Sequence, residues 1–221
     1  GLDEARSPTM EDMEKRLNDP DIISGVRDTG GRVTLAIYDC KKPVIAAING
    51  AAVGIGATMT CAMDIRLASE NTRIGFVFNK IGITPEACST WFLPRIVGVS
   101  QALEWCYTAD IIGPEEALSA GLVKSVLPAD ELLAGAYRIA EKIAQHCPVA
   151  IALTRQMMYR NAAAPHPIEA HKVDSLAIFY ASLSSGKEGV QSFREKRAAN
   201  FTDKCSVNMP PFYPWWDQSE S

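Results

Sequence analysis

The sequence carries no pattern typical of a metal-binding, membrane-spanning or nucleic-acid-binding protein. Its six cysteines form no CxxC pair, and its three histidines lack the i, i+4 spacing of a zinc-binding helix. A formal net charge of −4 argues against a nucleic-acid partner. No apolar run reaches the roughly 18–20 residues of a membrane span. We therefore expect no metal and no membrane span, and a cytoplasmic protein, or one of an organelle matrix in a eukaryote, with reduced thiols.

Apolar residues make up 47% of the 221-residue chain and recur with the periods of both strands and helices. Mixed elements in residues 1–98 and helical spacing in residues 99–221 predict two parts and an α/β (α+β) fold class. Strands are predicted at 43–50, 64–69, 73–77 and 123–127. Helices are predicted at 31–40, 54–63, 85–98, 99–109, 113–122, 128–147, 147–162, 167–185 and 186–201.

One stretch, KPVIAAINGAAVGIGATMTCAMDIRLAS (42–69), places three glycines directly after a buried strand and before a predicted helix. Glycines there let backbone N–H groups approach a ligand closely. The GxxxGxG spacing is also similar to the cofactor loop of short-chain dehydrogenases. That family needs a Tyr-xxx-Lys pair far downstream, whereas the pair in this chain, Tyr38 and Lys42, precedes the glycines. A purely structural role for the glycines, in a turn and in packing, is the remaining alternative.

Residues 42–76 resemble the crotonase superfamily, the enoyl-CoA hydratases and isomerases. The shared pattern is a K-P-apolar strand ending in N-G, a G-x-G at the start of a helix, and a later strand containing F-G or its equivalent. GPEEALSAGLVKSVLPADELL (113–133) and GVQSFREKRAANF (189–201) resemble two further motifs of that superfamily, in the same order. The resemblance covers roughly residues 42–203.

The resemblance implies a crotonase-like ββα spiral core, here partial (1–98), followed by a C-terminal helical trimerisation region (99–221). It implies a homotrimer or a dimer of trimers. The expected ligand is an acyl-CoA thioester, with CoA as part of the substrate and no separate cofactor. Since the first strands of the superfamily have no counterpart, we also expect the chain to be N-terminally incomplete.

The same resemblance implies an oxyanion hole for the thioester enolate. Backbone N–H donors aimed at the developing oxyanion contribute a few kcal/mol each. The superfamily uses the middle residue of G-x-G, which is Ile55, and flanking glycines, Gly54 and Gly56, let the thioester approach. A second donor would be the N–H of Leu2, if GLD (1–3) corresponds to the superfamily's other oxyanion motif.

Two glutamates that hydratases of the superfamily use are replaced here by Thr58 and Phe78, which cannot activate water. Glu86 lies where several isomerases of the superfamily carry a single acidic residue, and one carboxylate suffices to move a proton along an acyl chain. We expect it beside an acyl pocket lined by Phe76, Phe78 and Trp91, whose apolar walls would raise its pKa. Alternatively, Glu86 is a first-turn residue of a helix that begins at Pro85.

The closing basic helix resembles the superfamily segment that lies against CoA, which implies phosphate contacts from Lys196 and Arg197. A solvated helix end is the alternative. The tail that contains Trp215 and Trp216 is expected to pack on the protein surface. Three functional hypotheses remain: an enoyl-CoA isomerase that uses Glu86, an enoyl-CoA hydratase, and a non-catalytic acyl-CoA-binding or scaffold protein.

Overall fold

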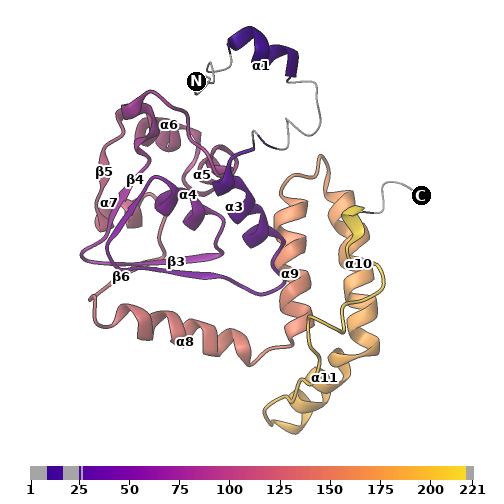
Figure 1. Ribbon diagram of the computed structural model, residues 1–221. Coiled ribbons are helices and arrows are strands. Elements are labelled where there is room, and N and C mark those ends of the chain that lie inside the picture. Colours follow the sequence, from indigo (N-terminus) through magenta and orange to yellow (C-terminus); the bar gives the residue numbers. More distant parts are fainter. Residues whose placement is uncertain (1–8, 17–24, 26, 218–221) are drawn as a thin grey trace, which may run out of the picture.

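The computed structural model describes residues 9–16, 25 and 27–217. Its strands form two three-stranded sheets, β1-β3-β6, which is parallel throughout, and β2-β4-β5, in which β5 runs antiparallel to β4 (Figure 1). Two successive strands enter different sheets and a helix follows them, so the chain repeats a ββα unit. The strands are β1 (Ile45–Ile48), β2 (Ala51–Val53), β3 (Ile65–Ser69), β4 (Arg73–Gly75), β5 (Ile111–Ile112) and β6 (Ser125–Leu127).

Helices enclose the β1-β3-β6 sheet, and after β6 the described residues contain helices and irregular segments but no further strand. α3 and α4 lie on one side of this sheet and α8 on the other, whereas α9, α10 and α11 extend away from it (Figure 1). The front helices are α1 (Met10–Arg16), α3 (Thr29–Asp39), α4 (Ile55–Cys61), α5 (Ser89–Val97), α6 (Val99–Thr108) and α7 (Pro114–Ser119), with the 3-10 helix η1 (Val77–Ile81). The later helices are α8 (Leu132–Ala144), α9 (Pro148–Asn161), α10 (Pro167–Leu183) and α11 (Ser185–Glu195), with the 3-10 helix η2 (Trp215–Asp217).

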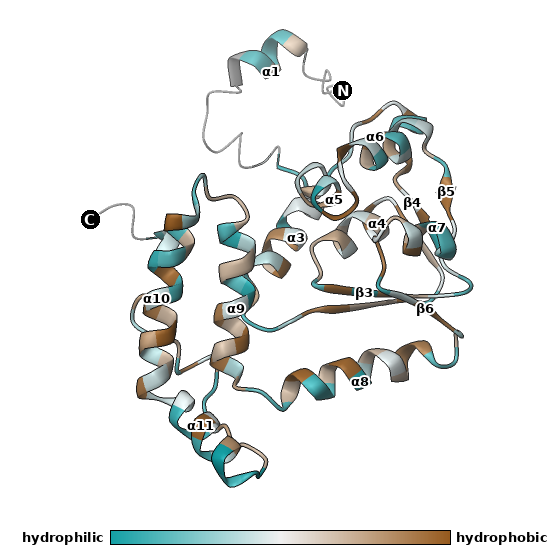
Figure 2. Cartoon of the chain, turned by 180° about the vertical axis from the view of Figure 1, so that it is seen from behind, coloured by the Kyte–Doolittle hydropathy of each residue, from teal (hydrophilic) through white to brown (hydrophobic). Residues whose placement is uncertain are grey.

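The sequence pattern of each element explains what it buries. Strands β1 and β3 are largely covered on both faces, as expected of parallel strands with nearly continuous apolar sequence. α8 is amphipathic, and its buried residues Leu132 and Ala136 pack on Leu67 of β3. Apolar and polar residues alternate along α8 in Figure 2. The predicted α/β class is confirmed, while the division at residues 98/99 stays a prediction, since β5 and β6 follow it in the sequence.

Side chains hold the corner between successive strands. The hydroxyl of Thr72 donates to the carbonyl of Ile48 at 2.6 Å, and that of Ser69 donates to the carbonyl of Asn49 at 2.8 Å. Both donors are fully buried. Since a buried carbonyl without a partner is costly, these bonds stabilise the step from one sheet to the other at the end of β1.

Several details differ from the sequence prediction. β2 and β5 were not expected, because runs of three and two residues are too short to signal a strand. The helix predicted at 85–98 begins only at Ser89, because Ala87 and Cys88 adopt left-handed backbone conformations with φ of 55° and 56°. Residues in that conformation cannot continue a right-handed helix.

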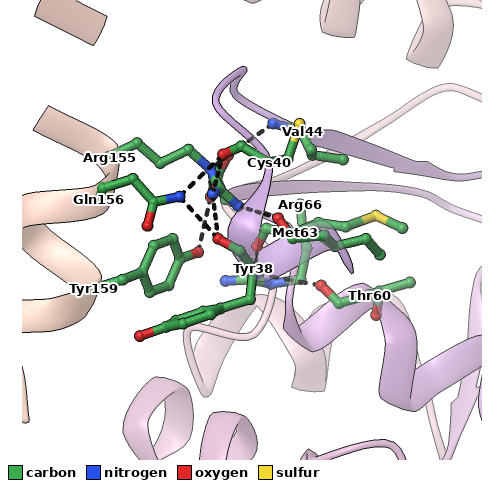
Figure 3. A network of polar contacts seen from close by, with 11 residues as sticks. Tyr38, Cys40, Val44, Thr60, Met63, Arg66, Arg155, Gln156 and Tyr159 are labelled. Atoms are coloured by element: carbon green, nitrogen blue, oxygen red, sulfur yellow. Dashed lines mark hydrogen bonds and ion pairs between the residues drawn. The ribbon is translucent and has the colours of Figure 1, made fainter. Parts of the chain in front are cut away.

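A buried arginine joins α9 to the core (Figure 3). The guanidinium of Arg155 binds both carboxylate oxygens of Asp64 at 2.9 and 3.0 Å. It also donates to three carbonyls at the end of α3, those of residues 37, 38 and 40, at 2.7–2.8 Å. Tyr159 donates to Asp64 at 2.8 Å, and Gln156 donates to two of the same carbonyls. The network therefore satisfies the carboxyl end of α3, where carbonyls lack helical partners.

Substituting Arg155→Met should lower the free energy of unfolding by about 3–5 kcal/mol, because Asp64 and the α3 carbonyls would lose buried partners. Urea unfolding followed by circular dichroism measures this change. Lys172→Gln is the matched control, since Lys172 forms an exposed ion pair with Glu169, and it should change the unfolding free energy by under about 0.5 kcal/mol. Equal effects of the two substitutions would contradict this account.

Candidate active site

The carboxylate of Glu86 lies between the first turns of α3 and α4. The hydroxyl of Thr58, on α4, donates to Glu86 Oε1 at 2.9 Å. A Cβ built on Gly30, on α3, would lie 2.0 Å from Glu86 Oε2 and 2.6 Å from the Cδ1 of Ile55. The missing side chain at position 30 thus leaves the space that the carboxylate occupies, next to the Ile55 side chain.

The backbone around Glu86 is a turn that precedes α5. The carbonyl of Glu86 accepts hydrogen bonds from the N–H of Ser89 at 3.0 Å and from its hydroxyl at 2.6 Å. The two residues that follow Glu86 have left-handed backbone conformations. Such conformations cost energy in non-glycine residues and concentrate at functional sites. The alternative prediction, a first-turn helical residue stabilised by the helix dipole, is therefore wrong.

Asp28, which the sequence analysis did not single out, completes the cluster. It caps the N-terminus of α3, where its Oδ1 accepts the N–H of Gly31. The same oxygen accepts the N–H of Ala87, the residue after Glu86, at 3.1 Å. The side chains of Asp28 and Glu86 are near enough for each carboxyl group to affect the pKa of the other. An aspartate before a predicted helix is a recognisable capping signal, but its nearness to residue 86 is a tertiary contact.

The two carboxyl groups have pKa values displaced in opposite directions. Burial raises the pKa of Glu86, the Thr58 hydroxyl partly opposes this rise, and the hydrogen bond and charge of Asp28 add to it. Burial also disfavours ionised Asp28, but the N–H groups of Gly31 and Ala87 and the bond to Glu86 outweigh it, so the pKa of Asp28 is lowered. Carboxyl pairs whose pKa values are driven apart are typical of acid–base sites.

Ile55 is placed as an oxyanion donor would be. It is the first residue of α4, whose early N–H groups lack helical partners, and no described residue accepts its N–H. Gly54 precedes it with φ of +59° and ψ of −125°, a conformation suited to glycine. A Cβ at Gly56 would meet nothing in this chain. The Ile55 side chain is 45% exposed rather than buried in the core. Its catalytic role stays a prediction.

The predicted aromatic pocket is not assembled as expected. Phe76 is completely buried and stacks on Trp105 with ring centroids 6.2 Å apart, so it belongs to the core. Phe78 is also buried, within η1. Trp91 instead lines a cavity of about 490 Å³ between α5 and α9, whose lining does not include Glu86. The prediction that these three residues form one wall beside Glu86 is therefore wrong, because two of the rings fill the core. Leu2, the second predicted oxyanion donor, lies outside the described residues.

The two predicted phosphate contacts differ in their surroundings. Arg197 is held by Glu188 through two hydrogen bonds of 2.6 and 2.9 Å, and by Glu195 at 2.6 Å. Lys196 ends α11 in a left-handed conformation, and within 9–16, 25 and 27–217 its ammonium has no hydrogen bond or ion pair. Of the two, Lys196 has the cation available for a phosphate, and the contact itself stays a prediction.

The tail packs on the protein surface. Trp215 and Trp216 contact each other and Tyr213, and Trp216 stacks on the guanidinium of Arg160, so the predicted surface packing of the tail is observed.

Over the described part of the chain, no three His, Cys, Asp or Glu side chains are grouped as a metal would require. None of the helices described could cross a membrane.

Comparison with known proteins agrees with this geometry. The profile of one protein family, described as enoyl-CoA hydratase/isomerase, matches residues 11–204. The chain belongs to the enoyl-CoA hydratase/isomerase family. The fold neighbours include an enoyl-CoA hydratase from Bacillus anthracis, with a TM-score of 0.78 and 30% identity over 87% of this chain and 75% of that one. The predicted crotonase resemblance is confirmed.

Curated relatives of the family are similar over most of this chain. The enoyl-CoA hydratase ACTT3 of Alternaria alternata is 42% identical over 180 residues, which are 80% of this chain and 60% of that protein. The crotonyl-CoA hydratase of Syntrophomonas wolfei subsp. wolfei is 37% identical over 79% of this chain and 67% of its own length. This hydratase/isomerase family member thus spans about three-fifths of the length of ACTT3.

Substituting Gly30→Ala should displace the Glu86 carboxylate while leaving the fold intact. The new methyl group would overlap the ends of the Glu86 and Ile55 side chains and lie 3.0 Å from the Cβ of Ala87, and alanine is favoured over glycine in a helix by about 1 kcal/mol. We expect a loss of acyl-CoA turnover of at least about tenfold without loss of thermal stability, measured by turnover assay and thermal unfolding. Gly189→Ala, on α11, is the control: its Cβ would meet only Phe201, at 3.8 Å, and activity should be retained. Full activity of Gly30→Ala would contradict this placement.

Proposed function

We propose that this family member stabilises the enolate of an acyl-CoA thioester and shifts a carbon–carbon double bond along the acyl chain, as an enoyl-CoA isomerase. The observation that carries this proposal is the position of Glu86. Its carboxylate, with a raised pKa, is held by Thr58 beside the start of α4, where the Ile55 N–H has no partner among the described residues. An acid–base group and an oxyanion donor on adjoining elements are what enolate chemistry needs.

In the proposed reaction, the carboxylate of Glu86 removes a proton from C2 of a 3-enoyl thioester. The electron pair moves toward the carbonyl, and negative charge develops on its oxygen, which the Ile55 N–H stabilises. The protonated Glu86 then returns the proton to C4 as the double bond forms between C2 and C3. No electrons are gained or lost, so the proposed reaction needs no separate cofactor. We place it in the cytoplasm or an organelle matrix, in line with the six free cysteines.

Hydration of a 2-enoyl thioester is the second candidate, and the names of the relatives favour it. ACTT3 and the Syntrophomonas wolfei protein are both named as hydratases. In this chain Thr58 and Phe78 occupy the two positions of the hydratase glutamates, so water would have to be activated by Glu86. A protein that binds acyl-CoA without turning it over is the third hypothesis.

Substituting Glu86→Gln should lower the rate of turnover by about 10²–10⁴-fold, because the amide keeps the shape of the side chain but cannot accept the proton. Purified protein is incubated separately with a 3-enoyl-CoA and a 2-enoyl-CoA, and the products are separated by chromatography. The isomerase proposal predicts the 2-enoyl product from the first substrate and little hydroxyacyl product from the second.

Glu115→Gln, an exposed substitution on α7, is the matched control and should retain full turnover. Binding of a saturated acyl-CoA, measured by calorimetry, should be nearly unchanged in Glu86→Gln. Hydroxyacyl-CoA as the main product would establish the hydratase instead. Binding without any product would leave the non-catalytic hypothesis.

We also propose that the protein assembles as a homotrimer or a dimer of trimers. α10 exposes several large apolar side chains, including Leu176, Ile178, Phe179 and Leu183. Figure 2 shows apolar residues along much of α10. An apolar surface of this kind on a helix is typical of a subunit interface.

Substituting Phe179→Asp should therefore shift the protein toward monomer, because a charge would be buried at the contact. Phe179 is 56% exposed in the single chain, so the substitution should not unfold it. Analytical ultracentrifugation of the wild type and the variant measures the change. A monomeric wild type at micromolar concentration would contradict the proposed assembly.

A further inference from the structure

The carboxylate of Asp28 is held by two elements of the candidate active site, α3 and the turn that carries Glu86. Its Oδ1 accepts the N–H of Gly31 in the first turn of α3 and, at 3.1 Å, the N–H of Ala87 in the turn that carries Glu86. These two bonds tie the carboxylate to both elements at once. Asp28 therefore cannot swing away from Glu86 without breaking the helix cap and the turn.

The carboxyl groups of Asp28 and Glu86 influence each other's ionisation, and two neighbouring carboxyl groups do not both ionise readily. The two N–H donors that converge on Asp28 favour its ionised form. Glu86 receives no backbone N–H bond to its side chain among the described residues. The arrangement thus favours ionised Asp28 beside protonated Glu86 over the reverse.

We propose that Asp28 is a positioning residue, whose fixed negative charge makes Glu86 hold a proton more tightly and so act as a stronger base once ionised. This inference rests on the proposed role of Glu86. Asp28 lies before α3, apart from both hydratase glutamate positions, 58 and 78. A general base works best when its pKa lies near the working pH, which a lone exposed glutamate does not achieve.

Charged and titratable side chains other than Asp28 do not explain why Glu86 holds its proton more tightly. Thr58 and Ile55, which reach Glu86 from α4, carry no charge, and neither does Gly30 on α3. On α3, Arg32 lines a groove with Val33 and Ala36. Arg27 is exposed to solvent. The thiol of Cys88 packs against the hydrophobic core. Asp28 is the one charged side chain, among the described residues, that acts on the pKa of Glu86.

Asp28→Asn tests the proposal, because asparagine caps helices about as well as aspartate and its Oδ1 can still accept both N–H groups. The substitution removes the charge and keeps the geometry. Asp39→Asn is the matched control, at the other end of α3, where Asp39 forms an exposed ion pair with Arg160. Circular dichroism and thermal unfolding establish that each variant is folded.

The first readout does not depend on activity. The side-chain carboxyl carbon of Glu86 is followed by ¹³C NMR as a function of pH, and its signal is assigned by its absence in Glu86→Gln. We expect the wild-type midpoint to lie above that of an ordinary glutamate. Asp28→Asn should lower the midpoint by about one pH unit or more, and Asp39→Asn should leave it unchanged.

The second readout is the pH dependence of kcat/KM for the acyl-CoA reaction. Activity requires ionised Glu86, so it falls as the pH drops below the pKa of this group. Asp28→Asn should move this acid limb to lower pH by the same shift as the NMR midpoint, and it should lower the plateau several-fold because the base is weaker. A purely structural role would lower the plateau without moving the limb.

An NMR midpoint that Asp28→Asn leaves in place overturns the proposal. A wild-type Glu86 that titrates in the ordinary range of a glutamate overturns it as well, without any variant. If the midpoint moves as expected but the wild type turns over no acyl-CoA, then the proposed function fails while the coupling of the two carboxyl groups stands.

Discussion

The buried interaction of Arg155 with Asp64 and with the last carbonyls of α3 sets the position of that helix. It joins three segments that are distant in sequence: α9, the carboxyl end of α3 and the turn before β3. The other end of α3 carries Asp28 and Gly30, which adjoin the Glu86 carboxylate. An α-helix is stiff over this length, so a fixed carboxyl end also fixes the amino end. Through Arg155, α9 therefore helps to hold Asp28 and Gly30 in place beside Glu86.

The site itself combines two unlike backbone features. A glycine with positive φ opens α4 and leaves the Ile55 N–H without a partner in the described residues. Two left-handed residues delay the start of α5 and bring the side chain of Glu86 to α3 and α4. Both features cost conformational energy, and each places a polar group where a thioester could reach it. The absence of a side chain at Gly30 gives the carboxylate room to lie between them.

The sequence alone predicted the features that depend on local pattern and on family motifs. Strands β1, β3 and β4, the helix opened by Gly54 and the family itself followed from the stretch 42–76 and from two later motifs. Three features depend on contacts between distant residues and were not predictable: Asp28 beside Glu86, the Thr58 bond to the carboxylate, and the burial of Phe76 against Trp105. Pro85 suggested a helix start, but a tertiary bond from Asp28 and a local bond from Ser89 hold a turn there instead.

The central claim is that Glu86 exchanges a proton with the carbon next to an acyl-CoA carbonyl. This is tested by hydrogen exchange at C2 of a saturated acyl-CoA, which is incubated with the protein in D₂O and followed by ¹H NMR. A saturated substrate can neither be isomerised nor hydrated, so exchange reports on the proton transfer alone. The account predicts loss of the C2 proton signal with the wild-type protein, and no loss above the protein-free rate with Glu86→Gln. Exchange that persists in Glu86→Gln at the wild-type rate, or that is absent with the wild type, would contradict it.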